Sequence, residues 1–68
     1  MKYQKINNAT GVWTVYAVSD DLMKEKCIAT NNIKRKLDDE WTKYLNIDSM
    51  NDVDVEWITK EEAFLMAL

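Results

Sequence analysis

The chain has 68 residues and a mass of 8.0 kDa, and 47% of its residues are hydrophobic, 31% are charged and the formal net charge is −3. This length is enough for one domain over residues 1–68, and the hydrophobic fraction is high enough to exclude a disordered chain. With no histidine and one cysteine, the composition excludes histidine-based catalysis, a disulfide within the chain and a cysteine-cluster metal site.

Further functions are excluded by features that the sequence lacks. No apolar run approaches the roughly 20 residues that cross a membrane, and no signal peptide is recognisable. The single glycine and the absence of proline leave no phosphate-binding loop. No set of catalytic side chains assembles along the chain. We therefore expect a cytoplasmic protein without enzymatic activity, cofactor, metal or membrane contact.

Charge is distributed unevenly along the chain. Residues 1–36 hold seven basic and three acidic side chains, a net charge of +4, whereas residues 37–68 hold nine acidic and two basic ones, a net charge of −7. In so small a domain this asymmetry predicts a directional field that favours a basic partner. The alternative is that the charges interleave in the folded chain and cancel.

The beginning of the chain is typical of a β-hairpin. Tyr3–Ile6 and Val12–Val18 are rich in β-branched and aromatic residues, and the asparagines and glycine between them tolerate the positive φ of a hairpin loop. Trp13 and Tyr16 lie on opposite faces of the second strand, because side chains alternate along a strand. We expect Trp13 in the core and Tyr16 turned toward a partner.

The middle of the chain has two interpretations. Apolar residues recur at helical spacing after the candidate N-caps at residues 19–21, which predicts one helix, straight or kinked, over residues 20–46. In the alternative, Lys26–Thr30 is a third strand and a helix covers residues 33–46. That alternative puts the cations of residues 34–36 into the first turn of a helix, where the macrodipole disfavours them, so we favour the single helix.

The end of the chain predicts a strand and a short helix. Asp52–Ile58 alternates between acidic and apolar residues, which is the pattern of a strand with one face in the core. Thr59 and Glu62 have the spacing of a capping box, which opens a helix over Glu61–Leu68. The apolar face of the strand includes Trp57, which we expect to meet the other tryptophans in the core.

These elements predict an α+β fold with the order β-β-α-β-α. In it a small antiparallel sheet, made of the hairpin and a third strand, packs on the long or kinked helix, and a short helix follows at the C-terminal end.

Two groups of acidic side chains are candidate partner-binding sites. On the last strand, Asp52, Asp54 and Glu56 share one face at steps of about 6.8 Å, a spacing comparable to that of phosphates along one nucleic-acid strand. The alternative is a solvated face that protects a sheet edge from pairing.

The second group is Asp38, Asp39 and Glu40. These residues follow the cations of residues 34–36 at an offset of four, so the alternative is that they neutralise one face of the predicted helix. The neighbouring carboxylates also argue against direct binding of nucleic acid by the cations, because they repel phosphate.

The functional expectation is a small acidic module that binds a host or cognate protein and blocks its surface. If that protein handles nucleic acid, the two carboxylate groups would occupy its basic groove as a nucleic-acid mimic. Eight lysines to one arginine, six asparagines and no proline suggest a phage or mobile element, in which small inhibitors of host proteins are common. The alternatives are a homodimeric regulator that uses its apolar C-terminal helix as the interface, and a structural subunit of a larger assembly.

Overall fold

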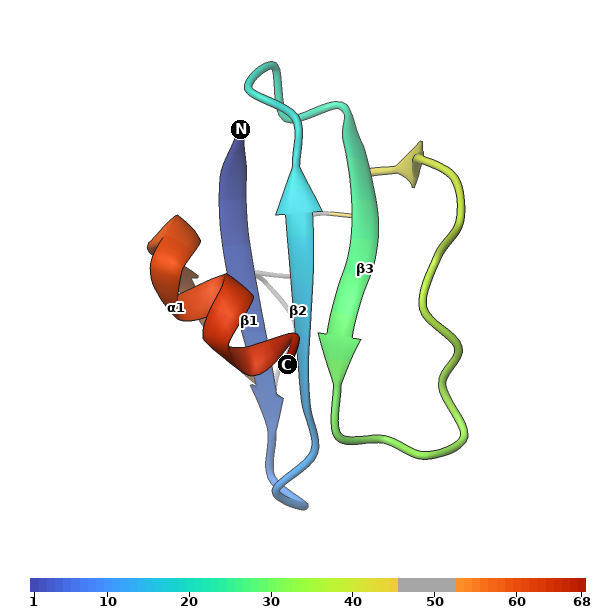
Figure 1. The fold of residues 1–68 in the computed structure, drawn as a ribbon, viewed down its shortest axis with the longest axis vertical. Coiled ribbons are helices and arrows are strands. Elements are labelled where there is room, and N and C mark those ends of the chain that lie inside the picture. The colour runs from blue at the N-terminus through green and yellow to red at the C-terminus, as the bar shows by residue number, and fades with distance from the viewer. Residues whose placement is uncertain (46–52) are drawn as a thin grey trace.

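The computed structural model describes residues 1–45 and 53–68. Figure 1 shows its strands and helix, which are, in chain order, β1 (Lys2–Asn8), β2 (Trp13–Val18), β3 (Lys24–Thr30), β4 (Thr42–Lys43), β5 (Val53–Ile58) and α1 (Lys60–Met66). The strands form one antiparallel sheet in the order β4-β3-β2-β1-β5. The expected fold, a sheet packed on a long helix in the order β-β-α-β-α, is wrong. The described chain is mostly sheet, and its one helix has seven residues.

The N-terminal hairpin is confirmed. Its loop is organised by Asn8, whose side-chain oxygen accepts hydrogen bonds from the backbone N–H groups of Thr10 at 3.1 Å and Val12 at 3.2 Å. Gly11 has a φ of +85°, a conformation that residues with a Cβ rarely adopt. The loop sequence therefore specifies the turn directly, which is why the pattern was sufficient here.

The segment after β2 turns back as a strand instead of beginning a helix. The Ser19 hydroxyl oxygen accepts a hydrogen bond from the backbone N–H of Lys24 at 3.0 Å, and the Asp21 carboxylate accepts one from the N–H of Met23 at 3.0 Å. These are the side chains expected to cap a helix, and here they close a tight turn. Leu22 has a φ of 59°, which is left-handed and does not continue into a right-handed helix.

The single helix over residues 20–46 is therefore wrong, and the alternative strand is confirmed in β3. Glu25, Cys27 and Ala29 are buried while the residues between them are half-buried, a period of two. The central strand β2 needs a neighbour on each side to pair its backbone, and β3 supplies the second one. The pairing of the β2 backbone with β3 depends on the whole sheet, and it decides the structure of this segment although its apolar residues have helical spacing.

The helix of the alternative interpretation, over residues 33–46, is also wrong as far as residue 45. The side-chain oxygen of Asn32 accepts the N–H of Lys34 at 3.0 Å, and the backbone carbonyl of Asn32 accepts the N–H of Arg35 at 3.0 Å. These bonds make a single turn that does not continue into a helix. The three cations of residues 34–36 oppose the positive end of a helix dipole at this place. The chain instead runs alongside β3 to the short β4 (Figure 1).

The helix α1 begins with the predicted capping box. The Thr59 hydroxyl oxygen accepts the N–H of Glu62 at 3.1 Å, and the Glu62 carboxylate accepts the N–H of Thr59 at 3.2 Å. α1 lies across one face of the sheet over β1, where the rings of Tyr3 and Phe64 meet edge to face at 5.9 Å (Figure 1). No helix in the described ranges is long and apolar enough to cross a membrane.

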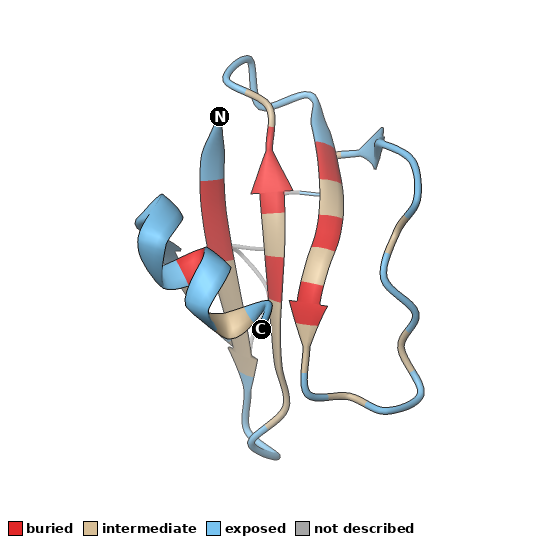
Figure 2. Ribbon diagram, in the orientation of Figure 1, coloured by how far each residue is buried: buried red, intermediate tan, exposed pale blue. Residues whose placement is uncertain are grey.

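The main buried cluster lies between α1 and the sheet face that it covers, which we call the helix face, while Val18 and Cys27 are buried on the opposite face. Figure 2 shows buried residues on β1, β2 and β3 and at one position of α1. The buried cluster and the half-buried side chains packed against it come from four strands and the helix: Tyr3, Val15, Ala17, Ala29 and Ala63, with Trp13, Ile28, Ile58 and Met66.

Residues 31–45, which include β4 and which we call the irregular segment, run beside β3 and send side chains over the opposite face of β2 and β3. The Arg35 guanidinium carbon lies 6.0 Å from the ring centroid of Tyr16, and the Tyr44 hydroxyl donates to Oε1 of Gln4 at 3.3 Å. This segment takes the place that the long helix was expected to occupy.

The expectation that the three tryptophans meet in the core is wrong. Trp13 packs against the buried cluster, but Trp41 lies in the irregular segment and is exposed. Trp57 lies on the opposite face of β5, with 48% of its surface exposed. Alternation correctly placed Trp57 and the carboxylates on different faces of β5, but it gave no information about which face the rest of the chain would bury.

Candidate functional site

The carboxylates of β5 lie at one edge of the sheet. β5 pairs with β1, and no other strand of the described chain adjoins it. Glu56 lies opposite Lys5, and residues directly opposite in an antiparallel pair point to the same side. Tyr3, which shares that side with Lys5, packs under α1. Asp54 and Glu56 therefore both point to the helix face, beyond the part that α1 covers.

These two carboxylates are open to solvent. Asp54 and Glu56 are both exposed, and neither makes an ion pair within 4.0 Å with a cation of the described residues. The first turn of α1 adds two more exposed carboxylates, Glu61 and Glu62, close by in the chain. Asp52, the third acidic residue expected on this strand, lies outside the described residues.

Asp38 is placed inside the fold. Its Oδ2 accepts the backbone N–H of Cys27 at 2.8 Å, and its own N–H donates to the Cys27 carbonyl at 3.1 Å. Arg35 approaches the same carboxylate, with Nη2 3.6 Å from Oδ2. Asp38 thus fastens the irregular segment to β3, and its expected part in partner binding stays a prediction.

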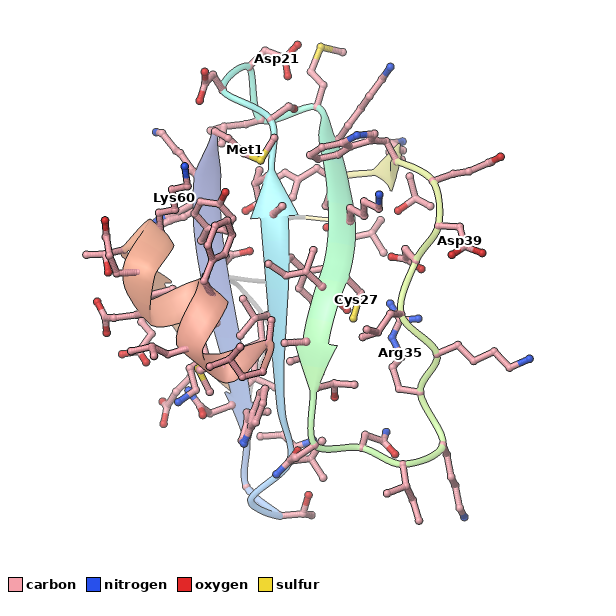
Figure 3. The ribbon with its side chains drawn as sticks, viewed as in Figure 1. Met1, Asp21, Cys27, Arg35, Asp39 and Lys60 are labelled. Atoms are coloured by element: carbon pink, nitrogen blue, oxygen red, sulfur yellow. The ribbon has the colours of Figure 1, made fainter. Side chains whose placement is uncertain are left out.

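Asp39 and Glu40 are exposed but lie far from β5 along the sheet. They belong to the segment beside β3, whereas β5 lies beyond β2 and β1. Figure 3 shows Asp39 beyond β3, at the edge of the sheet away from α1. The structure therefore separates the two acidic groups that the sequence analysis combined. The helical pairs expected between residues 34–36 and 38–40 are not formed, since no helix covers these residues.

Tyr16 is half-buried on the opposite face of β2, beneath Arg35. It does lie on the other side of the strand from Trp13, as alternation predicts. The guanidinium above its ring reduces the surface that is available to a partner, and its binding role stays a prediction.

A buried polar group on the opposite face was not expected from the sequence. Glu25 is only 8% exposed, and its carboxylate accepts the backbone N–H of Leu45 at 2.9 Å. Burial raises the pKa of this carboxyl, and the nearby Asp38 raises it further. Burial also raises the pKa of the Cys27 thiol, which is fully buried as a small apolar side chain. No signal in the sequence indicated the burial of Glu25, because this residue stands between Lys24 and Lys26 in a charged stretch of β3.

No protein-family description, curated protein or solved structure matches the chain.

Proposed function

We propose that the chain is a non-enzymatic protein-binding module whose β5 carboxylates contact a basic surface of a partner protein. The observation that supports this is the exposure of Asp54 and Glu56 on one side of an edge strand, without an ion pair to any described cation. Uncompensated charges on one surface accelerate association with a partner of opposite charge.

The proposed partner is a cytoplasmic host or cognate protein with a basic nucleic-acid-binding groove. Two carboxylates two residues apart on a strand lie about 6.8 Å apart, which suits a groove that accepts successive phosphates. In this proposal the module inhibits its partner by occupying the groove, as a phage-encoded inhibitor would, and does not itself bind nucleic acid.

The test is affinity capture from a bacterial lysate with three baits: the parent chain, D54N/E56Q and D39N/E40Q. Each double variant removes two charges from exposed carboxylates while it keeps side-chain size. D39N/E40Q is the matched control, because Asp39 and Glu40 lie at the edge of the sheet opposite to β5. We expect D39N/E40Q to retain the partner and D54N/E56Q to lose it. Binding of the purified partner should weaken mainly through a slower on-rate, with a flatter dependence on salt.

Equal retention by all three baits would place the interface away from β5. Circular dichroism of both variants serves as the folding control, because exposed charges contribute little to stability.

A second candidate function is a homodimeric regulator, and the exposed side of α1 favours it. Only Ala63 of α1 is buried, whereas Phe64, Leu65 and Leu68 are exposed, Leu65 by 69%. A stable interface takes roughly 800 Å² from each partner, however, and a helix of about 10 Å in length covers only part of that area. We therefore rank the dimer below the monomeric binding module.

A further inference from the structure

An open pocket with a volume of about 500 Å³ lies where β1 begins and β5 ends. Tyr3 is opposite Ile58 in the register, so the first residues of β1 lie beside the link from β5 to α1. Figure 3 shows Met1 and Lys60 at this end of the sheet. The lining comes from both strands and from the first residue of the helix: Met1, Lys2, Tyr3, Trp57, Ile58 and Lys60.

Trp57 gives this pocket an aromatic wall. Nearly half of its surface is exposed, although its neighbour across the strands, Gln4, is fully buried. The ammonium nitrogen of Lys2 lies 5.6 Å from the centroid of the Trp57 ring, within cation–π range. The ammonium group covers part of the ring, and the 48% of the Trp57 surface that stays exposed offers a flat apolar contact next to a positive charge.

The pocket is also positively charged within a chain of net charge −3. Neither Lys2 nor Lys60 has a carboxylate within 4.0 Å among the residues that the structure describes, whereas the amino group of Met1 is already paired with Asp20. The Lys60 ammonium nitrogen lies 5.5 Å from the centroid of the Phe64 ring, so each lysine of the pocket lies over a different aromatic ring. An anion in the pocket is attracted by both positive charges.

We propose that this pocket binds a nucleoside monophosphate, which carries a flat aromatic base and a phosphate monoester on one small molecule. A phosphate monoester carries a charge of about −1.5 to −2 at neutral pH, which two lysines match. A flat base can stack on Trp57, since aromatic side chains accept any base by its π-face. The volume lies within the range of small-molecule sites, about 300–1,000 Å³. This proposal does not depend on the carboxylates of β5.

The direct test is a titration of the ¹⁵N-labelled chain with adenosine monophosphate, followed by the NMR signals of the indole N–H groups. The three tryptophans give separate signals, and Trp13 and Trp41 do not line the pocket, so they serve as internal controls. We expect the Trp57 signal to shift and saturate. Adenosine and inorganic phosphate, titrated separately, should each bind at least tenfold more weakly, because each lacks half of the recognised chemistry.

Lysine variants separate this site from a general attraction to cations. Lys2→Gln and Lys60→Gln should each weaken binding of adenosine monophosphate about tenfold. Lys36→Gln, at an exposed lysine of the irregular segment beside β3, should leave it unchanged. All three side chains are exposed, and the dispersion of the backbone amide signals checks that each variant is folded.

Three results would overturn the proposal. They are the absence of a saturable Trp57 shift, equal affinity for adenosine and its monophosphate, and equal loss of binding in Lys36→Gln and the pocket variants. None of these results affects the capture experiment with the β5 variants, so the two proposals are tested independently.

Discussion

The buried Glu25 determines how stability depends on pH at the scale of a single residue. Because burial raises the pKa of its carboxyl in the folded chain, the folded state keeps this proton to a higher pH than the unfolded state does. The contribution of Glu25 to the free energy of unfolding is therefore most favourable below a pH of about 4.3, which is the ordinary pKa of a glutamate side chain. That contribution is lost as the pH rises through the folded pKa.

Glu25→Gln removes this titration and keeps an oxygen that can accept the N–H of Leu45. We expect the variant to be at least as stable as the parent at pH 8, and its advantage to shrink as the pH is lowered toward 4. Denaturant unfolding at both values measures the difference. Glu40→Gln, at an exposed carboxylate, is the control and should follow the parent. A variant that is less stable than the parent at pH 8 would show that the hydrogen bond to Leu45 outweighs the desolvation.

Single residues also show how far a sequence pattern can be taken. Alternation along β5 correctly separated Asp54 and Glu56 from Trp57, because a strand places successive side chains on opposite faces whatever surrounds it. The same pattern misplaced Trp57 in the core, because burial depends on which face α1 covers. Which face is covered depends on elements distant in sequence, so the sequence of β5 alone does not indicate it.

At the scale of elements, the capping box is the clearest test of how α1 is held. We expect Thr59→Ala to lower the free energy of unfolding by about 1 kcal/mol, because the N–H of Glu62 loses its acceptor. Thr59→Ser keeps the hydroxyl and should recover most of the loss. Thermal and denaturant unfolding, followed by circular dichroism, measure both variants. A loss well above about 2 kcal/mol would mean that the Thr59 side chain does more than cap the helix.

The hairpin, the strand β5 and the capping box of α1 were predicted, whereas β3 was only the alternative interpretation and the turn before it was not predicted. The hairpin loop and the capping box each depend on a few adjacent side chains, so their sequences were sufficient. β3 depends on the need of β2 for a second neighbour, while its apolar residues also suit a helix. The turn through Leu22 was misread, because Ser19 and Asp21 suit a helix cap as well as a turn and leucine rarely adopts positive φ.

At the scale of the whole molecule, the state of association separates the two candidate functions. We expect a monomer by light scattering at all concentrations tested, because the exposed side of α1 is small and self-association through β5 would bring like charges together. Leu65→Glu, on the exposed side of α1, should leave the mass unchanged. A dimer that Leu65→Glu dissociates would instead favour the homodimeric regulator.

The position of β1 between β2 and β5 has a consequence for the order of folding. The contacts of β1 with β2 span a short stretch of chain, but Tyr3 and Ile58 are more than fifty residues apart. Closing so long a loop costs entropy before any contact rewards it, which slows the formation of a sheet. During synthesis the first three strands can pair as they emerge from the ribosome, while one side of β1 stays open until β5 follows. In that interval a nascent chain exposes a strand edge to its neighbours on a polysome, and rapid docking of β5 limits aggregation.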